Sequence, residues 1–396
     1  MRNLKDKKKP SLIMHILYYF WLFFTIVFSD KVPLYSNICA IGIMVVGAYY
    51  LLRDKRLVIH REIIWLLFFT LFGFLSAIWS PIPSYTLTRA KTLLKLLVFL
   101  IMFVSYIDKT GDTEFLLTGL EIMANIIAIY TIYRYGFNSL KAIMLTNGRR
   151  VGGEFVNENT LGLFLMMGNI ITLFKVICFS KPKRLLFVII PFAVSLMTAS
   201  RKVILIIPVA LIIIFSMKMK SQSSADNKMK SVFIVVLVFV IGISIYNTPL
   251  ANTLRNRLST MIGNGSTLDY SVRNRYGMIE LGLEIFKEYP LLGVGLNGSL
   301  AYANGTYLHS NYVELLATGG IVGSLIYYAY YLYIFGKMYK VKTEKTSSWR
   351  NLGLLFFAIC LITDAGAVTY FSKTQYLYFI IFAIAIGKHS KASIIE

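Results

Sequence analysis

Charged residues are scarce in this sequence. They make up 15% of its 396 residues, whereas soluble domains carry about 25%. Hydrophobic residues reach 57% and gather in blocks that are too long for a surface facing water. This composition excludes a soluble enzyme, a disordered chain and a secreted disulfide scaffold, and it is typical of an integral membrane protein.

Cysteine, histidine and acidic residues are also few. The three cysteines, Cys39, Cys178 and Cys360, all lie in apolar stretches, and three cannot all pair with one another. The sequence has no His or Cys cluster with metal-ligand spacing, no phosphate-binding loop motif and no dinucleotide fingerprint. We therefore expect no disulfide framework, no metal site and no cofactor.

Basic residues outnumber acidic ones by 41 to 19, which gives a formal net charge of +22. The lysines and arginines lie between apolar blocks instead of gathering on one face. This distribution argues against a nucleic-acid partner and favours a membrane protein with basic loops, whose partner is the lipid bilayer.

The apolar blocks predict an all-α polytopic fold, because a helix needs about 20 mostly apolar residues to cross the bilayer. We expect one integral membrane domain over residues 1–396. Twelve segments are candidate spans: 12–29, 34–52, 62–79, 90–107, 115–135, 160–179, 185–199, 202–217, 231–247, 311–336, 351–369 and 374–387.

The basic loops predict the orientation of these spans. With a cytoplasmic N-terminus, the inner segments hold 24 Lys and Arg and the outer ones 15. Short inner loops rich in basic residues follow the positive-inside rule, so we expect both termini in the cytoplasm. Eighteen of the 24 inner cations are lysines, whereas nine of the 15 outer ones are arginines. Arginine suits phosphate or carboxylate recognition, so the outer face is expected to hold an anion; chance and snorkelling at helix ends are the alternatives.

Two outer loops are unusually long, over residues 136–159 and 248–310, and long loops are commonly functional. Within the second loop, the pattern of residues 272–288 predicts an amphipathic helix near the outer surface. Among the four histidines, only His309 is expected outside, where an imidazole could exchange a proton near neutral pH; helix capping is its alternative role. Arg201 at a helix border could bind an anion or snorkel. Arg149 and Arg150, beside two glycines, are either anion contacts or solvated charges, and Arg273 and Arg275 could instead anchor to lipid phosphates.

Four segments, taken in order, carry a family resemblance. They are GGEFVNENTLG from Gly152, TASRK around Arg201, an arginine followed by PLLGVG, and HSNYVELLATGGIVG from His309. In this order and on this side of the membrane, they resemble the O-antigen ligase and O-antigen or capsule polymerase superfamily of bacterial membrane glycosyltransferases. The resemblance covers residues 150–330 and implies a fold similar to the C-type glycosyltransferases, with a large outer loop between spans 9 and 10.

The resemblance also implies substrates and roles. The donor would be a glycan on polyprenyl diphosphate, and the enzyme would sit in the bacterial cytoplasmic membrane. Arg201 and Arg275 would hold the diphosphate without a metal, with Arg273 as the alternative to Arg275, and His309 would be the general base for an inverting displacement. Arg149, Arg150, Asn157, Asn159 and Asn311 are the expected substrate contacts.

Three functions are consistent with these features. A repeat-unit polymerase is our first expectation, with a chain-length regulator as a candidate partner. The alternative is a ligase that transfers finished glycan to an acceptor such as lipid A–core. A glycolipid flippase is disfavoured, because we find neither two related halves nor polar residues along a central path.

Overall fold

The computed structural model describes residues 9–28, 32–54, 60–146, 149–179, 182–221, 247, 252, 253, 255, 256, 259, 270–339 and 344–379. Every regular element within these ranges is helical and none is a strand, which confirms the predicted all-α class. The long helices are α1 (Leu12–Val27), α2 (Pro33–Asp54), α3 (Arg61–Leu75), α4 (Pro83–Thr110), α5 (Glu114–Leu145), α6 (Glu158–Phe179), α7 (Leu186–Met197), α8 (Arg201–Ser221), α11 (Tyr270–Glu288), α12 (Asn311–Tyr339) and α13 (Glu344–Asp364). Short 3-10 helices are η2 (Ser76–Ile78), η3 (Pro182–Leu185) and η5 (Gly298–Ala301).

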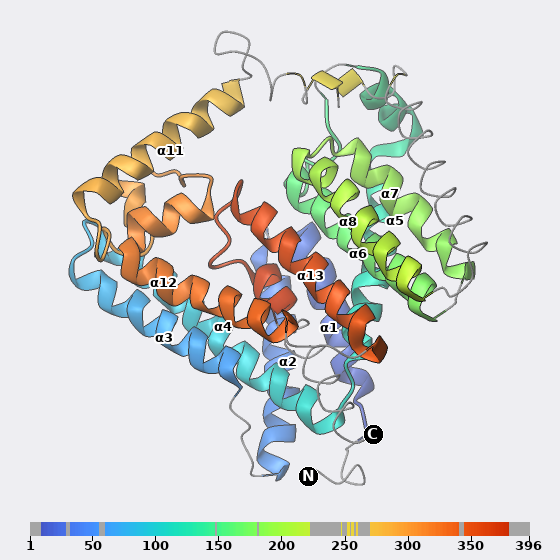
Figure 1. The fold of residues 1–396 in the computed structure, drawn as a ribbon, viewed down its shortest axis with the longest axis horizontal. Helices are drawn as coiled ribbons and strands as arrows, with labels where there is room; N and C mark the ends of the chain where they lie inside the picture. The colour runs from blue at the N-terminus through green and yellow to red at the C-terminus, as the bar shows by residue number, and fades with distance from the viewer. Residues whose placement is uncertain are drawn as a thin grey trace. The chain divides into compact units, whose positions relative to one another are not determined.

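The chain divides into two compact units. Unit 1 comprises residues 1–10, 41–113 and 269–396, and unit 2 comprises residues 11–40 and 114–268. Unit 1 therefore contains α3, α4, α11, α12 and α13, and unit 2 contains α1 and α5 to α8 (Figure 1).

In unit 1, α3 and α4 pack side by side as a helical hairpin, and α12 lies against α3 (Figure 1). The indole Nε1 of Trp65 on α3 donates to the carbonyl of Ile326 on α12 at 2.8 Å. Helices α11 and α13 both pack on α12. Helix α12 therefore contacts three other long helices of this unit, α3, α11 and α13.

In unit 2, α6 has the same central place. Helices α5, α7 and α8 all pack against it, and α1 packs on α5. A buried carboxylate fastens this group: Glu121 of α5 accepts from Lys175 of α6 at 2.8 Å and from Arg184 of η3 at 2.6 Å. Such a charge is costly in an apolar interior unless it is paired, so we read this cluster as structural.

Six described helices are long and apolar enough to cross a membrane, namely α2, α3 with η2, α4, α5, α6 and α12. The chain is thus a multi-pass membrane protein by length and composition of its helices, while the count of twelve spans stays a prediction. The predicted span 231–247 lies almost wholly outside the described residues, as does most of 374–387. Helix α7, with 12 residues, is about 18 Å long, which is less than the hydrocarbon thickness.

Helix α5 extends into the first predicted outer loop, residues 136–159. Helix α5 continues through Gly136, whose φ of 70° and ψ of 156° are not helical, and ends at Leu145. Glycine adopts this conformation without the steric cost that a Cβ would add, so the helix bends there and resumes. The second predicted loop contains α11 and η5, and α11 overlaps the amphipathic helix expected over 272–288.

Candidate functional site

In unit 1, the PLLGVG segment docks into a break in helix α12. Three backbone hydrogen bonds join them on either side of the break: from Ile321 to Pro290 (2.9 Å), from Val322 to Leu291 (3.1 Å) and from Val294 to Ala317 (3.0 Å). The break lies at Gly320, whose φ is 59°. The PLLGVG segment and the HSNYVELLATGGIVG segment, which the resemblance names separately, are therefore joined by backbone hydrogen bonds.

Glycine is required at position 320 for two reasons. Its φ is in the left-handed region, where a Cβ is disfavoured. A Cβ built there would also lie 2.4 Å from the carbonyl carbon of Leu291. Gly293 meets the helix in the same way, since its Cβ would lie 2.5 Å from the carbonyl carbon of Thr318. The glycines of both motifs thus permit backbone to touch backbone.

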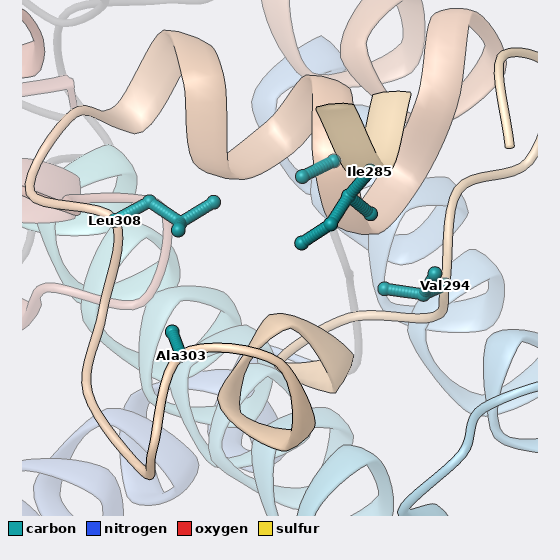
Figure 2. Close-up of a cluster of buried hydrophobic side chains, with 5 residues drawn as sticks. Ile285, Val294, Ala303 and Leu308 are labelled. Atoms are coloured by element: carbon teal, nitrogen blue, oxygen red, sulfur yellow. The ribbon is translucent and has the colours of Figure 1, made fainter. Parts of the chain in front are cut away.

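A cluster of buried apolar side chains lies behind this junction. Figure 2 shows Ile285 of α11, Val294 after it, and Ala303 and Leu308 of the following segment converging on one another. Ala317 of α12 completes the cluster. It holds α11 and the residues up to His309 against the first turns of α12.

In the chain, His309 follows Leu308 of this cluster and lies two residues before the start of α12. It is half-buried and has φ of 59°, in the left-handed region that non-glycine residues rarely adopt. Leu308 before it is fully buried, and the carbonyl of Ser310 after it accepts from the N–H of Glu314 at 2.9 Å. The backbone around His309 is thus held on both sides, and its unusual conformation is the kind of strain that often marks functional residues.

Asn311 has a structural role that its sequence motif did not reveal. Its side chain is fully buried, and Oδ1 accepts from the N–H groups of Thr369 (2.9 Å) and Tyr370 (3.0 Å). Nδ2 donates to the Tyr328 hydroxyl at 3.0 Å and to Asp364 at 3.4 Å. Both polar atoms of the amide are therefore used within the protein, which leaves little capacity to bind substrate.

The two arginines of α11 face different directions. Residues two apart on a helix differ by about 200° around its axis. Arg275 is half-buried and precedes Met278, which packs on the apolar cluster, by three residues, whereas Arg273 is exposed. The geometry favours Arg275 as the arginine closer to the body of unit 1.

In unit 2, the structure brings the GGEFVNENTLG and TASRK segments together. The N–H of Val151 donates to the carbonyl of Met197 at 3.1 Å. Arg150 Nε donates to the carbonyl of Thr198 at 2.8 Å. A Cβ at Gly162 would lie 2.4 Å from Thr198 Oγ1, so the close approach of α6 to this turn requires glycine.

The polar residues of the first segment also hold it in place. Arg150 Nη2 donates to Asn159 Oδ1 at 3.0 Å, and Nη1 lies 3.5 Å from the Glu158 carboxylate. Asn157 Oδ1 caps the start of α6 by accepting from the N–H groups of Asn159 (3.0 Å) and Thr160 (3.4 Å). Four substrate contacts were expected on this segment. Arg149 is exposed, whereas Arg150, Asn157 and Asn159 form hydrogen bonds within the protein.

Arg201 is the first residue of α8 and is half-buried. Ser200 before it is 1% exposed, and its hydroxyl has no hydrogen-bond partner among the described residues. The N-terminus of a helix favours anions because its free N–H groups and dipole point outward. The charge of Arg201 therefore adds to the positive potential at the N-terminus of α8, where an anion is favoured.

The sequence predicted no role for two charged residues of unit 1, Arg89 of α4 and Glu314 of α12. Glu314 is fully buried and accepts from Ser299 Oγ at 2.7 Å and from the N–H of Leu308 at 3.1 Å. A carboxylate in the first turn of an otherwise apolar helix is a signal that could have identified it, since such a group needs buried partners. For Arg89, no signal in the sequence predicts its partners.

Within the described ranges, no group of three or more His, Cys, Asp or Glu could hold a metal ion. No curated protein matches the chain. Residues 186–328, just over a third of the chain, match the family model described as O-antigen ligase. This match supports the resemblance: the segment that contains Arg201, Arg273, Arg275 and His309 is similar to the O-antigen ligase family.

Proposed function

We propose that this protein polymerises oligosaccharide repeat units that are linked to polyprenyl diphosphate, on the outer face of the bacterial cytoplasmic membrane. One observation carries the proposal: the family match over residues 186–328 includes Arg201, Arg275 and His309 together. Donor and acceptor would both be lipid-linked, which suits an enzyme whose helices are long and apolar enough to cross the bilayer.

The arginines would bind the donor's diphosphate. A guanidinium offers a planar fork of donors that matches phosphate oxygens, and it keeps its charge at any physiological pH. Arg201 is supported by its place at the N-terminus of α8, and Arg275 by its partial burial on α11. Arg149, which is exposed, is a further candidate contact.

His309 would act as the general base. Its imidazole would take the proton of the acceptor hydroxyl as that oxygen attacks the anomeric carbon of the donor. The bond from that carbon to the diphosphate oxygen breaks in the same step, and the arginines stabilise the negative charge on the departing diphosphate. A single displacement inverts the configuration at the anomeric carbon, and it needs no metal because the arginines neutralise the leaving group.

A ligase is the second candidate, and the description of the matched family names that activity. It would use the same donor and the same residues, and only the acceptor would differ. The chemistry at Arg201, Arg275 and His309 is common to both reactions, so the acceptor has to be identified from the products.

Glycan analysis of a deletion strain, with lipid-linked single repeats separated from polymer by size, tests the proposal. Accumulated single repeats, or lipid acceptors that carry one repeat, are expected for a polymerase. Full-length polymer that stays on polyprenyl diphosphate would show a ligase and overturn the proposal. Repeats held on the cytoplasmic leaflet would show a flippase and overturn both.

A further inference from the structure

Arg89 joins three parts of unit 1 that lie far apart in the sequence. Its Nη2 donates to Asn297 Oδ1 at 3.2 Å and to the Tyr307 hydroxyl at 2.5 Å. Its guanidinium carbon lies 3.4 Å from the ring centroid of Phe371. An arginine stacked on an aromatic face with two hydrogen bonds is held in one orientation.

The bonds of Arg89 reach both ends of the segment that leads to His309. Asn297 directly precedes η5 as its N-cap, and Tyr307 lies two residues before His309. Glu314 holds the same segment in the same manner, because its carboxylate accepts from Ser299 and from Leu308. The Arg89 guanidinium and the Glu314 carboxylate also interact electrostatically. Two charged groups thus fasten residues 297–308 at both ends.

His309 depends on this segment for its conformation. Its left-handed φ of 59° costs about 1 kcal/mol or more and persists only where the surrounding structure enforces it. The residues that enforce it from the N-terminal side are Tyr307 and Leu308, whose partners are Arg89 and Glu314.

We propose that Arg89 is a positioning residue for His309, acting through Tyr307 and Asn297. The inference rests on the proposed role of His309 in glycosyl transfer. Lysine cannot replace Arg89, because an ammonium group cannot stack flat on Phe371 and reach both acceptors in the same geometry. Tyr307→Phe removes one of these bonds with no change of shape.

The first test compares the steady-state kinetics of Arg89→Lys and Tyr307→Phe, with lipid-linked glycan extracted from the deletion strain as donor. We expect kcat to fall roughly tenfold to a hundredfold, because small displacements of a catalytic group are costly, while the donor KM stays within about twofold. Tyr302→Phe, on the same segment, removes a hydroxyl that does not bond to Arg89 and is expected to have wild-type kinetics. A raised donor KM with unchanged kcat would overturn the proposal, because it would show that Arg89 binds the donor.

The second test does not depend on activity. Diethyl pyrocarbonate modifies histidines at rates that reflect their surroundings, and mass spectrometry can follow His309 with His15, which stacks on Phe115 in unit 2, as the internal reference. We expect both variants to change the rate at His309 by at least about threefold and to leave His15 unchanged. An unchanged rate at His309 would overturn the positioning role. If instead His309→Ala retains wild-type transfer, the proposed function fails at that residue, whereas a changed modification rate would still establish that Arg89 positions it.

Discussion

The arginines of this chain differ in what their surroundings leave them able to do. Arg150 is bonded to a carbonyl and to an amide oxygen of its own unit, and Arg89 is stacked on an aromatic ring. Arg201 stands at the start of a helix, where an anion is favoured. Residue type alone does not separate these roles. The three arginines differ instead in the partners that surround each guanidinium.

Replacement of Arg201 by lysine keeps the charge and removes the planar fork. We expect polymer formation to fall on the order of 100-fold, as for loss of one oriented donor at a developing charge, while membrane insertion is unchanged. The measurement is the rate of polymer formation in membranes with matched amounts of protein. Arg53→Lys, at the exposed end of α2, is the control, and near-normal activity of Arg201→Lys would refute the diphosphate role.

Replacement of His309 by alanine removes the proposed base. Transfer should fall by roughly 10²- to 10⁴-fold, the usual contribution of general base catalysis, while binding of the lipid-linked donor to the purified protein persists. Donor retention and product formation are measured on the same preparation, with His15→Ala as control. Transfer at a similar rate to wild type would leave His309 with a structural role only.

At the scale of elements, the junction between the PLLGVG segment and α12 is built from backbone contacts. These contacts exist because glycines lie opposite backbone on both sides of the junction. The junction fixes the path of the chain from α11 to His309, so its disruption should affect both stability and transfer.

Gly320→Ala tests this junction. The substitution adds a Cβ at a positive φ and at 2.4 Å from Leu291, so we expect a loss of roughly 2–3 kcal/mol in unfolding free energy. Gly336→Ala lies on the same helix with open space around its Cβ, and it should change stability by less than about 1 kcal/mol. Thermal unfolding in detergent compares the two, and equal midpoints would contradict the assignment.

The pairing of α3 with α4 includes a titratable contact. His60, before α3, forms a hydrogen bond with Asp108 of α4, and this bond raises the pKa of the imidazole despite partial burial; Glu62 raises it and Lys337 lowers it to smaller extents. Since the folded-state pKa is raised, the contribution of this pair is fully present below about pH 6.5 and decreases as the pH rises through the folded-state value.

Asp108→Asn should therefore weaken the pH dependence of stability above about pH 6.5. Thermal unfolding midpoints over a pH series measure this dependence, and Asp112→Asn, just beyond the same helix, is the matched control. Identical pH profiles for wild type and Asp108→Asn would show that the pair contributes nothing.

At the scale of the whole molecule, the distribution of lysine and arginine predicts that residues 270–310 face outward and that both termini face the cytoplasm. A cysteine at position 276, where Tyr276 is 55% exposed, should react with a membrane-impermeant maleimide in spheroplasts. A cysteine at position 53 should react only after permeabilisation. The wild-type chain, which carries Cys39, Cys178 and Cys360, measures the background labelling, and the reverse labelling pattern would invert the topology.

The sequence by itself determined the class of this protein. Long apolar blocks require helices in a bilayer, because the backbone has no other partners there, and ordered motifs around Arg201 and His309 indicated the superfamily. Those signals are local in the chain, so they can be read without coordinates.

Only the tertiary structure decided which polar residues are committed to the fold. Asn311 is occupied by the backbone of residues 369–370, Arg150 by the turn before α8, and Arg89 and Glu314 by the segment before His309. These bonds join residues that are often tens to hundreds of positions apart, and no local pattern encodes such partners. A buried polar group is costly to leave unpaired. This cost favours the bonds of Arg89 and Glu314 to the segment before His309.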